Sequence, residues 1–465
     1  MNPSRRLLNT AYVVAHYRVE RTIPFWPRGW IERLQRYRLR AIIRHAHDTV
    51  PFYRQAMDQR GLRPSDFRTV EDLSKLPLID GMTVQGNLEG FLSTRHSDDS
   101  RLALYSSGSS SGIRRVIFWD KTSLLSKRAH PGRDRVVLES LVGQRRYLHV
   151  HIAPAGSARF ELLPFFQASS FNPPGLVQHR VLSPEEPFET ITERINTIRP
   201  QVVSSYGSFA EQFFRFLADR QMTIALPRVW IYGAEMLSPS GRELIENTFG
   251  CPTYSTYQAT ETGRLGFQCE ERRGFHLNID LCAVRLADED GRTVRPGELG
   301  EVVISNLHNR AMVLLNYRLD DWGVMAQEPC SCGRTLPLLE RLEGRSSEML
   351  RLADGRVMSS LTLDALCDDE LKPTLQIQIA QPAPGQIRWR IVPSSRADLD
   401  TLRGSLLERC RVVLGEDTQV EVEFVEGIPS TPQGKLIRVV SHVQEPDAQA
   451  RNAGRNRQKD QGLEK

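Results

Sequence analysis

The stretch that decides the fold class is PFETITERINTIRPQVVSSY, residues 187–206. Its first part has the spacing of a helix, and QVVSSY at its end is typical of a strand. The alternation continues on both sides, with strands predicted at YLHVHIA (147–153) and RVWIYGAE (228–235) and a helix at SPSGRELIENTF (238–249). Strands that alternate with helices of about 10–15 residues are typical of parallel sheets. The sequence therefore predicts an α/β fold.

The pattern changes toward the end of the chain. CAVRLADEDGRTV (282–294) is a hairpin candidate with Asp-Gly at its turn. Residues 348–442 mix strands with one helix, at 397–414, which predicts a separate small α+β domain. Residues 443–465 lack apolar periodicity and predict a disordered tail.

The chain has 465 residues and a formal net charge of +5, with 40% apolar and 25% charged residues. This is the composition of a globular protein. No apolar run reaches the ~18–20 residues that span a bilayer, and the start lacks the apolar block of a signal peptide. We therefore expect a cytoplasmic protein without a transmembrane segment. Its 7 cysteines are too few and too scattered for a disulfide scaffold.

The start of the chain is rich in arginine. Residues 31–60 predict an amphipathic helix with arginines on its outer face, and Thr69 with Asp72 predicts a capped short helix ahead of Pro77. A basic surface can contact membranes or nucleic acid, or it can be the solvated face of amphipathic helices. No basic and aromatic stripe or zinc-finger spacing supports nucleic acid as a partner.

The most unusual local stretch is LYSSGSSSGIRRVIFWD (104–120), which contains a dense run of serine and glycine. Glycine lets the backbone approach a ligand, while serine hydroxyls and consecutive N–H groups suit phosphate oxygens. No Gly-Lys-Ser/Thr follows, so this is not a Walker loop. A flexible linker is the alternative, but the position between strand-like segments disfavours it.

A second group of candidate residues lies in the segments CEERRGFH and PCSCGR. It consists of Cys269, His276, Cys330 and Cys332. Three thiolates and one imidazole form a complete tetrahedral zinc set with no open position, which is typical of a structural site. The alternative is ordinary reduced cysteines and a surface histidine. We expect the remaining cysteines to be packing residues.

Six motifs in order resemble the adenylate-forming ligases. They are SSGSSSG (106–112), YGAE (232–235), STYQATETG (255–263), NYRLDDWG (316–323), RLEGRSSEML (341–350) and PSTPQGKL (429–436). The segment at 39–80 is similar to the branch that contains phenylacetate–CoA ligases and capsule-biosynthesis-type relatives. The resemblance covers about residues 30–440, and it also supports the zinc set, because this branch has the same cysteine and histidine pattern.

The resemblance implies a large N-terminal adenylation domain (1–345) that binds ATP and a carboxylic acid. It also implies a mobile C-terminal domain (346–442) that bears a catalytic lysine, followed by the tail at 443–465. The expected reaction is formation of an acyl-AMP from an aromatic or other hydrophobic acid. Coenzyme A is the expected acceptor, with a carrier-protein thiol or an amine as alternatives. A non-catalytic nucleotide-binding relative is the other class, and the oligomeric state is not predicted.

The matching residues acquire roles from the resemblance. The pyrophosphate end of ATP is assigned to Ser107, Gly108, Ser109, Ser110 and Gly112. The nucleotide-binding set is completed by Gly233, Ala234 and Glu235 at the adenine, Tyr257 and Gln258 beside the ring, Asp321 on the ribose hydroxyls and Arg345 near the hinge. Thr260 is expected at the α-phosphate and Glu261 on Mg²⁺. Lys435 is expected to stabilise the charge that develops between carboxylate and α-phosphate.

The chain departs from the family pattern at several positions. The loop has three serines between its glycines, the usual Pro or Lys after it is missing, Gln258 and Asp320 each replace a glycine, and Ser347 replaces the hinge acid. The segment ADGRVMSS (353–360) matches poorly the part that aligns the thiol acceptor. We therefore expect robust acyl-AMP formation and slower thioester formation with free CoA.

Overall fold

A computed structural model describes residues 2–106, 115–154, 158–171, 177–431 and 435–443. The chain divides into two compact units. The larger contains Met1–Ser346 with Thr431–Lys435, and the smaller contains Ser347–Ser430 with Leu436–Lys465. The predicted serine and glycine loop at 107–112 and nearly all of the predicted tail lie outside the described residues.

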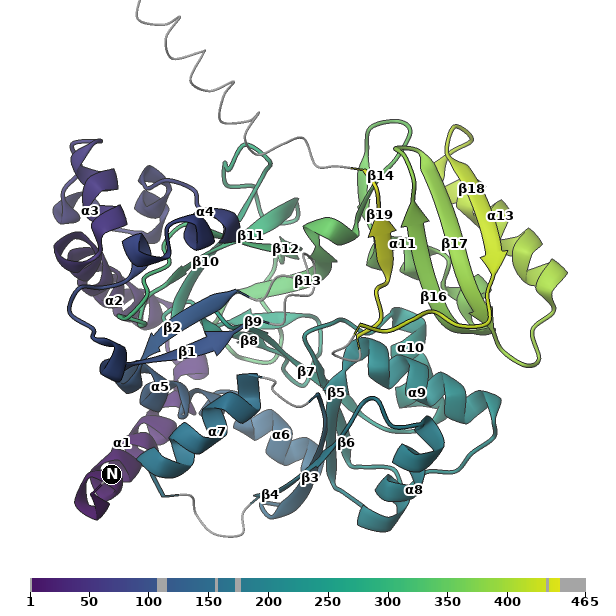
Figure 1. Ribbon diagram of the computed structural model, residues 1–465, viewed down its shortest axis with the longest axis horizontal. Coiled ribbons are helices and arrows are strands. Elements are labelled where there is room, and N and C mark those ends of the chain that lie inside the picture. The colour runs from purple at the N-terminus through teal and green to yellow at the C-terminus, as the bar shows by residue number, and fades with distance from the viewer. Residues whose placement is uncertain (1, 107–114, 155–157, 172–176, 432–434, 444–465) are drawn as a thin grey trace, which may run out of the picture. The chain divides into compact units, whose positions relative to one another are not determined.

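An 11-stranded sheet organises the larger unit, in the order β10-β11-β12-β13-β9-β8-β7-β6-β5-β3-β4 (Figure 1). Its bounds are β3 Tyr147–Ile152, β4 Val177–Leu182, β5 Val202–Tyr206, β6 Val229–Gly233, β7 Thr253–Ala259, β8 Gly263–Phe267, β9 Phe275–Leu277, β10 Cys282–Ala287, β11 Leu299–Asn306, β12 Tyr317–Met325 and β13 Leu338–Arg345. The strands from β4 to β7 pair in parallel, and β7 to β13 pair antiparallel.

Helices connect and cover the parallel half of this sheet. They are α6 Arg135–Val142, α7 Ala158–Ser169, α8 Phe188–Ile198, α9 Gly207–Asp219 and α10 Pro239–Glu243, whereas α5 Lys121–Lys127 packs against the segment 116–120. Figure 1 shows α9 beside β5 and β6, where Phe213, Phe214 and Trp230 form a buried aromatic cluster. The strands and helices predicted between 147 and 249 are present, and the predicted α/β fold is confirmed.

A small second sheet precedes β3 in the chain. The segment RVIFW forms β2 (Val116–Asp120), which pairs with β1 (Arg101–Tyr105) in a separate two-stranded antiparallel sheet. The hairpin predicted at 282–294 forms as a short one, with a single bridge between Ala287 and Thr293, while the full ladder of β10 is with β11. A tight turn with Gly291 at φ +81° still forms there.

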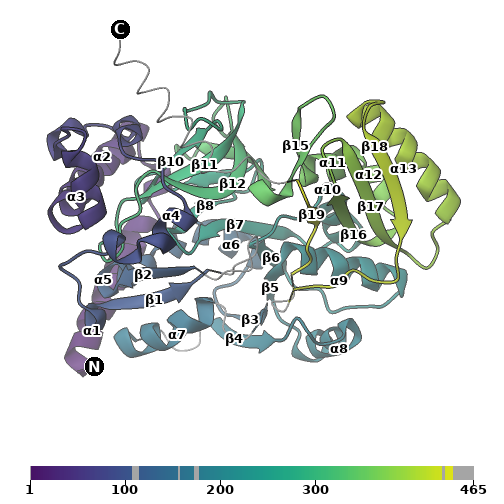
Figure 2. The same ribbon diagram turned by 45° about the horizontal axis from the view of Figure 1, so that its top comes forward.

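The N-terminal helices pack on segments that are far away in sequence. They are α1 Pro3–Glu20, α2 Arg28–Thr49, α3 Pro51–Asp58 and α4 Gly81–Gly86. The helix predicted over 31–60 is broken at Pro51, which starts α3 at a position where its missing N–H costs nothing. Gln35 donates to the carbonyl of Ile279 at 2.7 Å, and the Tyr53 hydroxyl accepts from the amide of Leu315 at 2.7 Å. Figure 2 shows α1 beside α5 and α7.

A buried charge cluster also holds the N-terminal part of the chain. Arg133 is fully buried and forms two bonds to the carboxylate of Asp280, at 2.7 and 2.9 Å. It also pairs with Glu20 at the end of α1, and Arg38 of α2 reaches Asp280 at 2.7 Å. The cluster therefore links two helices to the segment that precedes β10. The predicted cap is confirmed as well, because Thr69 and Asp72 form a capping box at a 3₁₀ helix.

The smaller unit has a four-stranded sheet in the order β18-β17-β16-β19. The one predicted helix is present, and two further short helices were not predicted. The strands are β14 Met349–Arg351, β15 Val357–Ser359, β16 Thr374–Gln381, β17 Gln386–Pro393, β18 Gln419–Phe424 and β19 Val439–Ser441. The helices are α11 Ser360–Leu366, α12 Asp368–Leu371 and α13 Leu399–Leu414. The core includes Trp389, Leu406 and Cys410, all fully buried. No helix among the described residues is long and apolar enough to cross a membrane.

Candidate active site

The predicted adenine segment lies where β6 ends. Gly233 is the last residue of β6, and Ala234 has a left-handed backbone with φ +62°. Ser208, at the start of α9, donates to the carboxylate of Glu235. The same turn passes so close to Gly207 that a Cβ there would lie 2.5 Å from the carbonyl oxygen of Glu235. The bond between Ser208 and Glu235 thus holds the ends of β5 and β6 together. Only glycine fits at position 207, because a side chain there would clash with this turn.

The predicted ribose residues form one connected group. The hydroxyl of Tyr257 donates to Asp321 Oδ2 at 2.7 Å, and Asp321 Oδ1 lies 3.9 Å from Arg345 Nε. Asp321 and Arg345 are directly paired in the β12–β13 register. Tyr257 is buried, and both burial and the neighbouring carboxylate raise its pKa, so it stays a hydroxyl donor. Asp321 and Arg345 lie on the consecutive strands β12 and β13, and Tyr257 lies on β7, which is distant from them in sequence.

Thr260 and Glu261 form the turn between β7 and β8. The carbonyl of Thr260 accepts from Trp119 Nε1 at 3.0 Å, and that of Glu261 accepts from Asn306 Nδ2 at 2.8 Å. The Glu261 side chain is buried, and burial raises its pKa while Arg115 and other cations oppose the shift. A buried oxygen ligand of this kind fits a divalent cation, whose charge offsets the burial of a carboxylate.

Two cations near Glu261 were not predicted from the sequence. Arg115 reaches Asp320 Oδ2 at 3.1 Å. Lys127 lies with its Nζ 4.3 Å from the centre of the Trp119 ring, and burial lowers its pKa to about 8 while Glu261 opposes the shift. A weak indication of Arg115 was present in the sequence, because this residue follows the loop at the place where the family pattern has Pro or Lys. Nothing in the sequence indicated Lys127, because this residue lies outside every motif.

Asp320 explains one departure from the family pattern. It occupies the position before the ribose aspartate where glycine is usual, and its backbone has φ +65°. This left-handed conformation favours glycine and is tolerated by Asp and Asn. The residue type therefore still fits the backbone, and the carboxylate adds an ion pair with Arg115.

Lys435 is buried, and its Nζ lies 4.9 Å from the centre of the Tyr206 ring. Its backbone is held by Thr431, whose amide donates to the Lys435 carbonyl at 2.7 Å and whose hydroxyl accepts from the Lys435 amide at 3.2 Å. Burial and Glu235 raise the pKa of Tyr206 to about 12. Tyr206 is the last residue of β5, so the lysine lies at the strand end that precedes Gly207.

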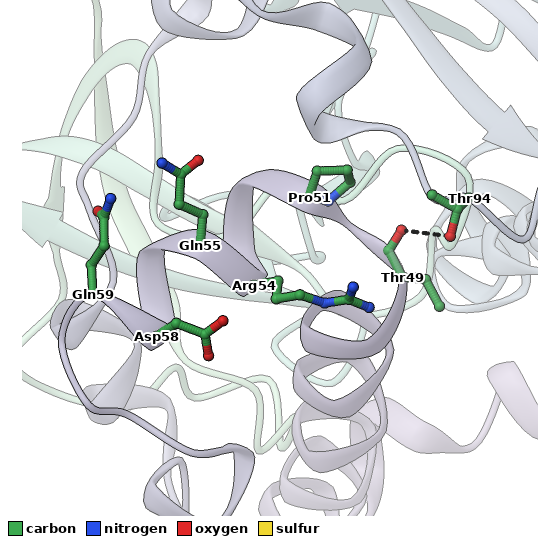
Figure 3. Close-up of a pocket in the computed structure, with 7 residues that line it drawn as sticks. All are labelled: Thr49, Pro51, Arg54, Gln55, Asp58, Gln59 and Thr94. Carbon is green, nitrogen blue, oxygen red and sulfur yellow. Dashed lines mark hydrogen bonds between the residues drawn. The ribbon is translucent and has the colours of Figure 1, made fainter.

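Not every predicted residue joins this group. The side chain of Gln258 is exposed, and its amide donates back to the Thr256 hydroxyl at 2.6 Å. A separate surface pocket at the end of α2 and along α3 is lined by Thr49, Pro51, Arg54, Gln55, Asp58, Gln59 and Thr94 (Figure 3). None of the residues predicted from the motifs lines it. That pocket is therefore no part of the candidate active site.

The predicted zinc ligands converge. The ligand atoms of Cys269, His276, Cys330 and Cys332 all lie within 4.8 Å of one another. The sulfurs of Cys269 and Cys330 are 3.6 Å apart, and Cys332 Sγ is 3.2 Å from His276 Nε2. With Zn–S of about 2.3 Å, a tetrahedral site separates its sulfurs by about 3.8 Å, so the geometry fits.

The surroundings of this cluster suit a metal as well. His276 Nδ1 lies 3.3 Å from the carbonyl oxygen of Leu336, a contact that leaves Nε2 free to face the sulfurs. Burial lowers the pKa of His276 to about 4, so the imidazole is neutral, as a ligand must be. The remaining cysteines, Cys251, Cys282, Cys367 and Cys410, are buried among apolar residues, as predicted.

Known proteins are similar to this chain over much of its length. No family model matches it. Phenylacetate-coenzyme A ligase of Thermus thermophilus is 25% identical over 456 residues, which cover 89% of this chain and 97% of that protein. The ligase of the same name from Escherichia coli is 24% identical over 75% of this chain and 79% of that protein. Protein CapK of Staphylococcus aureus is 22% identical over 54% of this chain and 55% of that protein.

Solved structures share the fold. The structure of 2-hydroxyisobutyryl-CoA ligase in the postadenylation state matches with a TM-score of 0.74 at 16% identity, covering 94% of each chain. The anthranilate CoA ligase AuaEII in complex with anthranoyl-AMP matches with a TM-score of 0.53 at 13% identity, covering 74% of this chain and 67% of that one.

Proposed function

Since this chain is an AMP-forming ligase of the adenylate-forming superfamily, in its phenylacetate–CoA ligase-like branch, we propose that it activates an aromatic or other hydrophobic carboxylic acid with ATP. The acid attacks the α-phosphorus to give acyl-AMP and pyrophosphate. The thiol of CoA then attacks the acyl carbon, which gives acyl-CoA and AMP. The observation that carries this proposal is the connected group of Tyr257, Asp321 and Arg345 beside buried Glu261.

Each described residue has a task that its surroundings support. Asp321 accepts hydrogen bonds from the ribose hydroxyls with a carboxylate that Tyr257 orients. Glu261 holds Mg²⁺, which when bound neutralises phosphate charge. Lys435 offsets the negative charge that grows between the carboxylate and the α-phosphate.

CoA is favoured as the acceptor because relatives over most of the chain length are named phenylacetate-coenzyme A ligases. No comparison supports a carrier protein. The segment at 353–360 matches the family pattern poorly. It contains the turn between β14 and β15, where Gly355 has φ +83°, and it also contains β15. The segment is therefore the second half of the β14–β15 hairpin, and Ser359 near its end caps α11.

The test is pyrophosphate release with ATP and Mg²⁺ across a panel of aromatic, aliphatic and hydroxy acids, followed by product mass analysis with CoA. We expect release with at least one hydrophobic acid and a thioester product in the presence of CoA. Nucleotide binding without release for any acid would favour a non-catalytic relative. Acyl-AMP without thioester would leave the adenylation step intact and point to a carrier-protein thiol or an amine as the acceptor.

A further inference from the structure

Three histidines meet at the edge of the parallel half of the large sheet. His149 and His151 lie two residues apart in β3 and so share one face of the strand. His179 lies directly opposite His149 in the β3–β4 register. Neighbouring strands are about 4.8 Å apart, so this placement brings three imidazoles together without any contribution from a loop.

The three rings are close enough to share one ion. Their ligand nitrogens all lie within 4.8 Å of one another. The ring centres of His149 and His151 are 3.8 Å apart, and those of His151 and His179 are 5.1 Å apart. The Nε2 atom of His151 is 2.9 Å from Nδ1 of His179. Around a tetrahedral zinc, nitrogens at about 2.1 Å from the metal are roughly 3.4 Å apart, so small ring rotations complete the site.

A supporting contact fixes the central ring. Ser204 of β5, which is paired with His151 in the sheet, places its hydroxyl 2.6 Å from His151 Nδ1. When this hydroxyl accepts the Nδ1 proton, the Nε2 lone pair of His151 faces His179. Outer contacts of this kind orient the histidine ligands of metal sites.

The burial of the three histidines and their position in the sheet also suit a metal site. His149 and His151 are buried, whereas His179 is exposed on β4, the edge strand of the sheet. An ion can therefore reach the site from solvent, and the two inner ligands are shielded from it. Neutral imidazole is a ligand for zinc and other first-row transition metals, and three such ligands leave the fourth position open, as in catalytic sites.

We propose that His149, His151 and His179 bind a divalent transition metal, with zinc as the ion, at a site separate from the cysteine cluster. Four strands lie between β3 and β9, which carries His276, so the two sites are roughly 24 Å apart along the sheet. The proposal does not depend on the ligase activity, because it uses residues that have no task in that reaction.

The test uses Co²⁺ as the probe, since a cobalt ion with nitrogen ligands absorbs in the visible range without the intense thiolate bands of the cysteine cluster. Full-length protein is stripped of metal and titrated, and bound metal per chain is measured. His179→Asn removes the exposed ligand with little risk to folding, and His442→Asn is the matched control, because His442 is an exposed histidine outside the cluster.

We expect His179→Asn to bind one equivalent less metal than the wild type and His442→Asn to bind the same amount. Ser204→Ala should keep the site but weaken Co²⁺ binding about 10-fold or more, as the loss of an outer contact typically does. The proposal is overturned if His179→Asn binds as much metal as the wild type. It is equally overturned if His151→Asn, with unchanged thermal unfolding, keeps the nitrogen-ligand spectrum.

Discussion

Asp320 affects the stability of the protein in two separate ways, through its backbone conformation and through its charge. With φ +65°, it sits where a β-carbon costs free energy, and its carboxylate pairs with Arg115 at 3.1 Å. Replacing it by alanine removes the ion pair and keeps the backbone cost, whereas glycine removes both.

We therefore expect Asp320→Gly to be more stable than Asp320→Ala by about 1 kcal/mol. The two free energies of unfolding can be compared by urea denaturation at pH 7. Equal stability of the two variants would show that the left-handed backbone carries no cost at this position.

Lys435 is the residue whose loss should affect chemistry most. We expect Lys435→Ala to reduce the rate of acyl-AMP formation at least ~100-fold, the effect of removing one group that stabilises transition-state charge. The affinity for ATP, measured by equilibrium binding, should change by less than about 3-fold. Lys372→Ala is the control, since Lys372 is an exposed lysine paired with Asp369. A Lys435→Ala enzyme with the wild-type rate would remove this residue from the mechanism.

The candidate site was predictable from the sequence only in part. Tyr257, Glu261 and Asp321 belong to motifs, so their roles could be predicted, but their contacts join strands that are distant in sequence. Lys127 could not be found in this way, because its lowered pKa arises from burial beside Trp119. The three histidines were visible as residues, but their meeting depends on the β3–β4 register, which no local pattern contains.

At the scale of elements, the cysteine cluster ties the segment after β8 to the connection between β12 and β13. Cys269 follows β8, His276 lies in β9, and Cys330 and Cys332 precede β13. A closed set of four ligands contributes folding free energy when metal is bound. The cluster should therefore act on stability and not selectively on catalysis.

We expect one zinc ion per chain at this cluster in protein prepared without chelator. Cys330→Ser should lose that ion and unfold at a lower temperature, while Cys251→Ser, at a buried cysteine outside the cluster, keeps it. The measurements are metal analysis and thermal unfolding. Full metal content in Cys330→Ser would exclude this cysteine as a ligand.

The buried charge cluster predicts how the N-terminal helices respond to acid. Burial alone would raise the pKa of Asp280, but Arg133 and Arg38 outweigh it and lower the pKa to about 2. A carboxyl group with a lowered pKa stabilises the folded state above its unfolded value of about 3.9, and this contribution is lost as the pH falls toward 2.

We expect Asp280→Asn to destabilise the protein by about 3–5 kcal/mol at pH 7, because it leaves Arg133 buried with one partner fewer. The difference from the wild type should shrink as the pH falls below about 4. Urea denaturation at pH 7, 5 and 3.5 measures it. A difference that is independent of pH would assign the loss to packing instead of charge.

At the scale of the whole molecule, the chain first passes between its two compact units at Ser346–Ser347, and it crosses again at Ser430–Thr431 and Lys435–Leu436. The proposed reaction has two half-reactions, and a hinge between units absorbs a conformational change in a few residues. The nearest anchor is the Trp322 indole, which donates to the Ser346 hydroxyl at 2.9 Å. Ser347 is the first residue beyond this anchor.

We expect Ser347→Pro, which restricts the backbone at this point, to slow thioester formation at least ~10-fold while acyl-AMP formation changes by less than about 3-fold. Single-turnover measurements of both steps in one enzyme preparation supply the internal control. Equal slowing of both steps would place the hinge elsewhere or indicate a folding defect.

The long-range packing of α2 and α3 has a consequence for how the protein is made. Gln35 pairs with Ile279 and Tyr53 pairs with Leu315. In each pair, more than half of the chain length is synthesised between the first residue and its partner. At about 5–20 residues per second, the interval between Tyr53 and Leu315 leaving the ribosome is roughly 13–50 s. During that time Gln35 and Tyr53 lack these partners, so the packing of α2 and α3 on the rest of the larger unit is completed only after Leu315 has been synthesised.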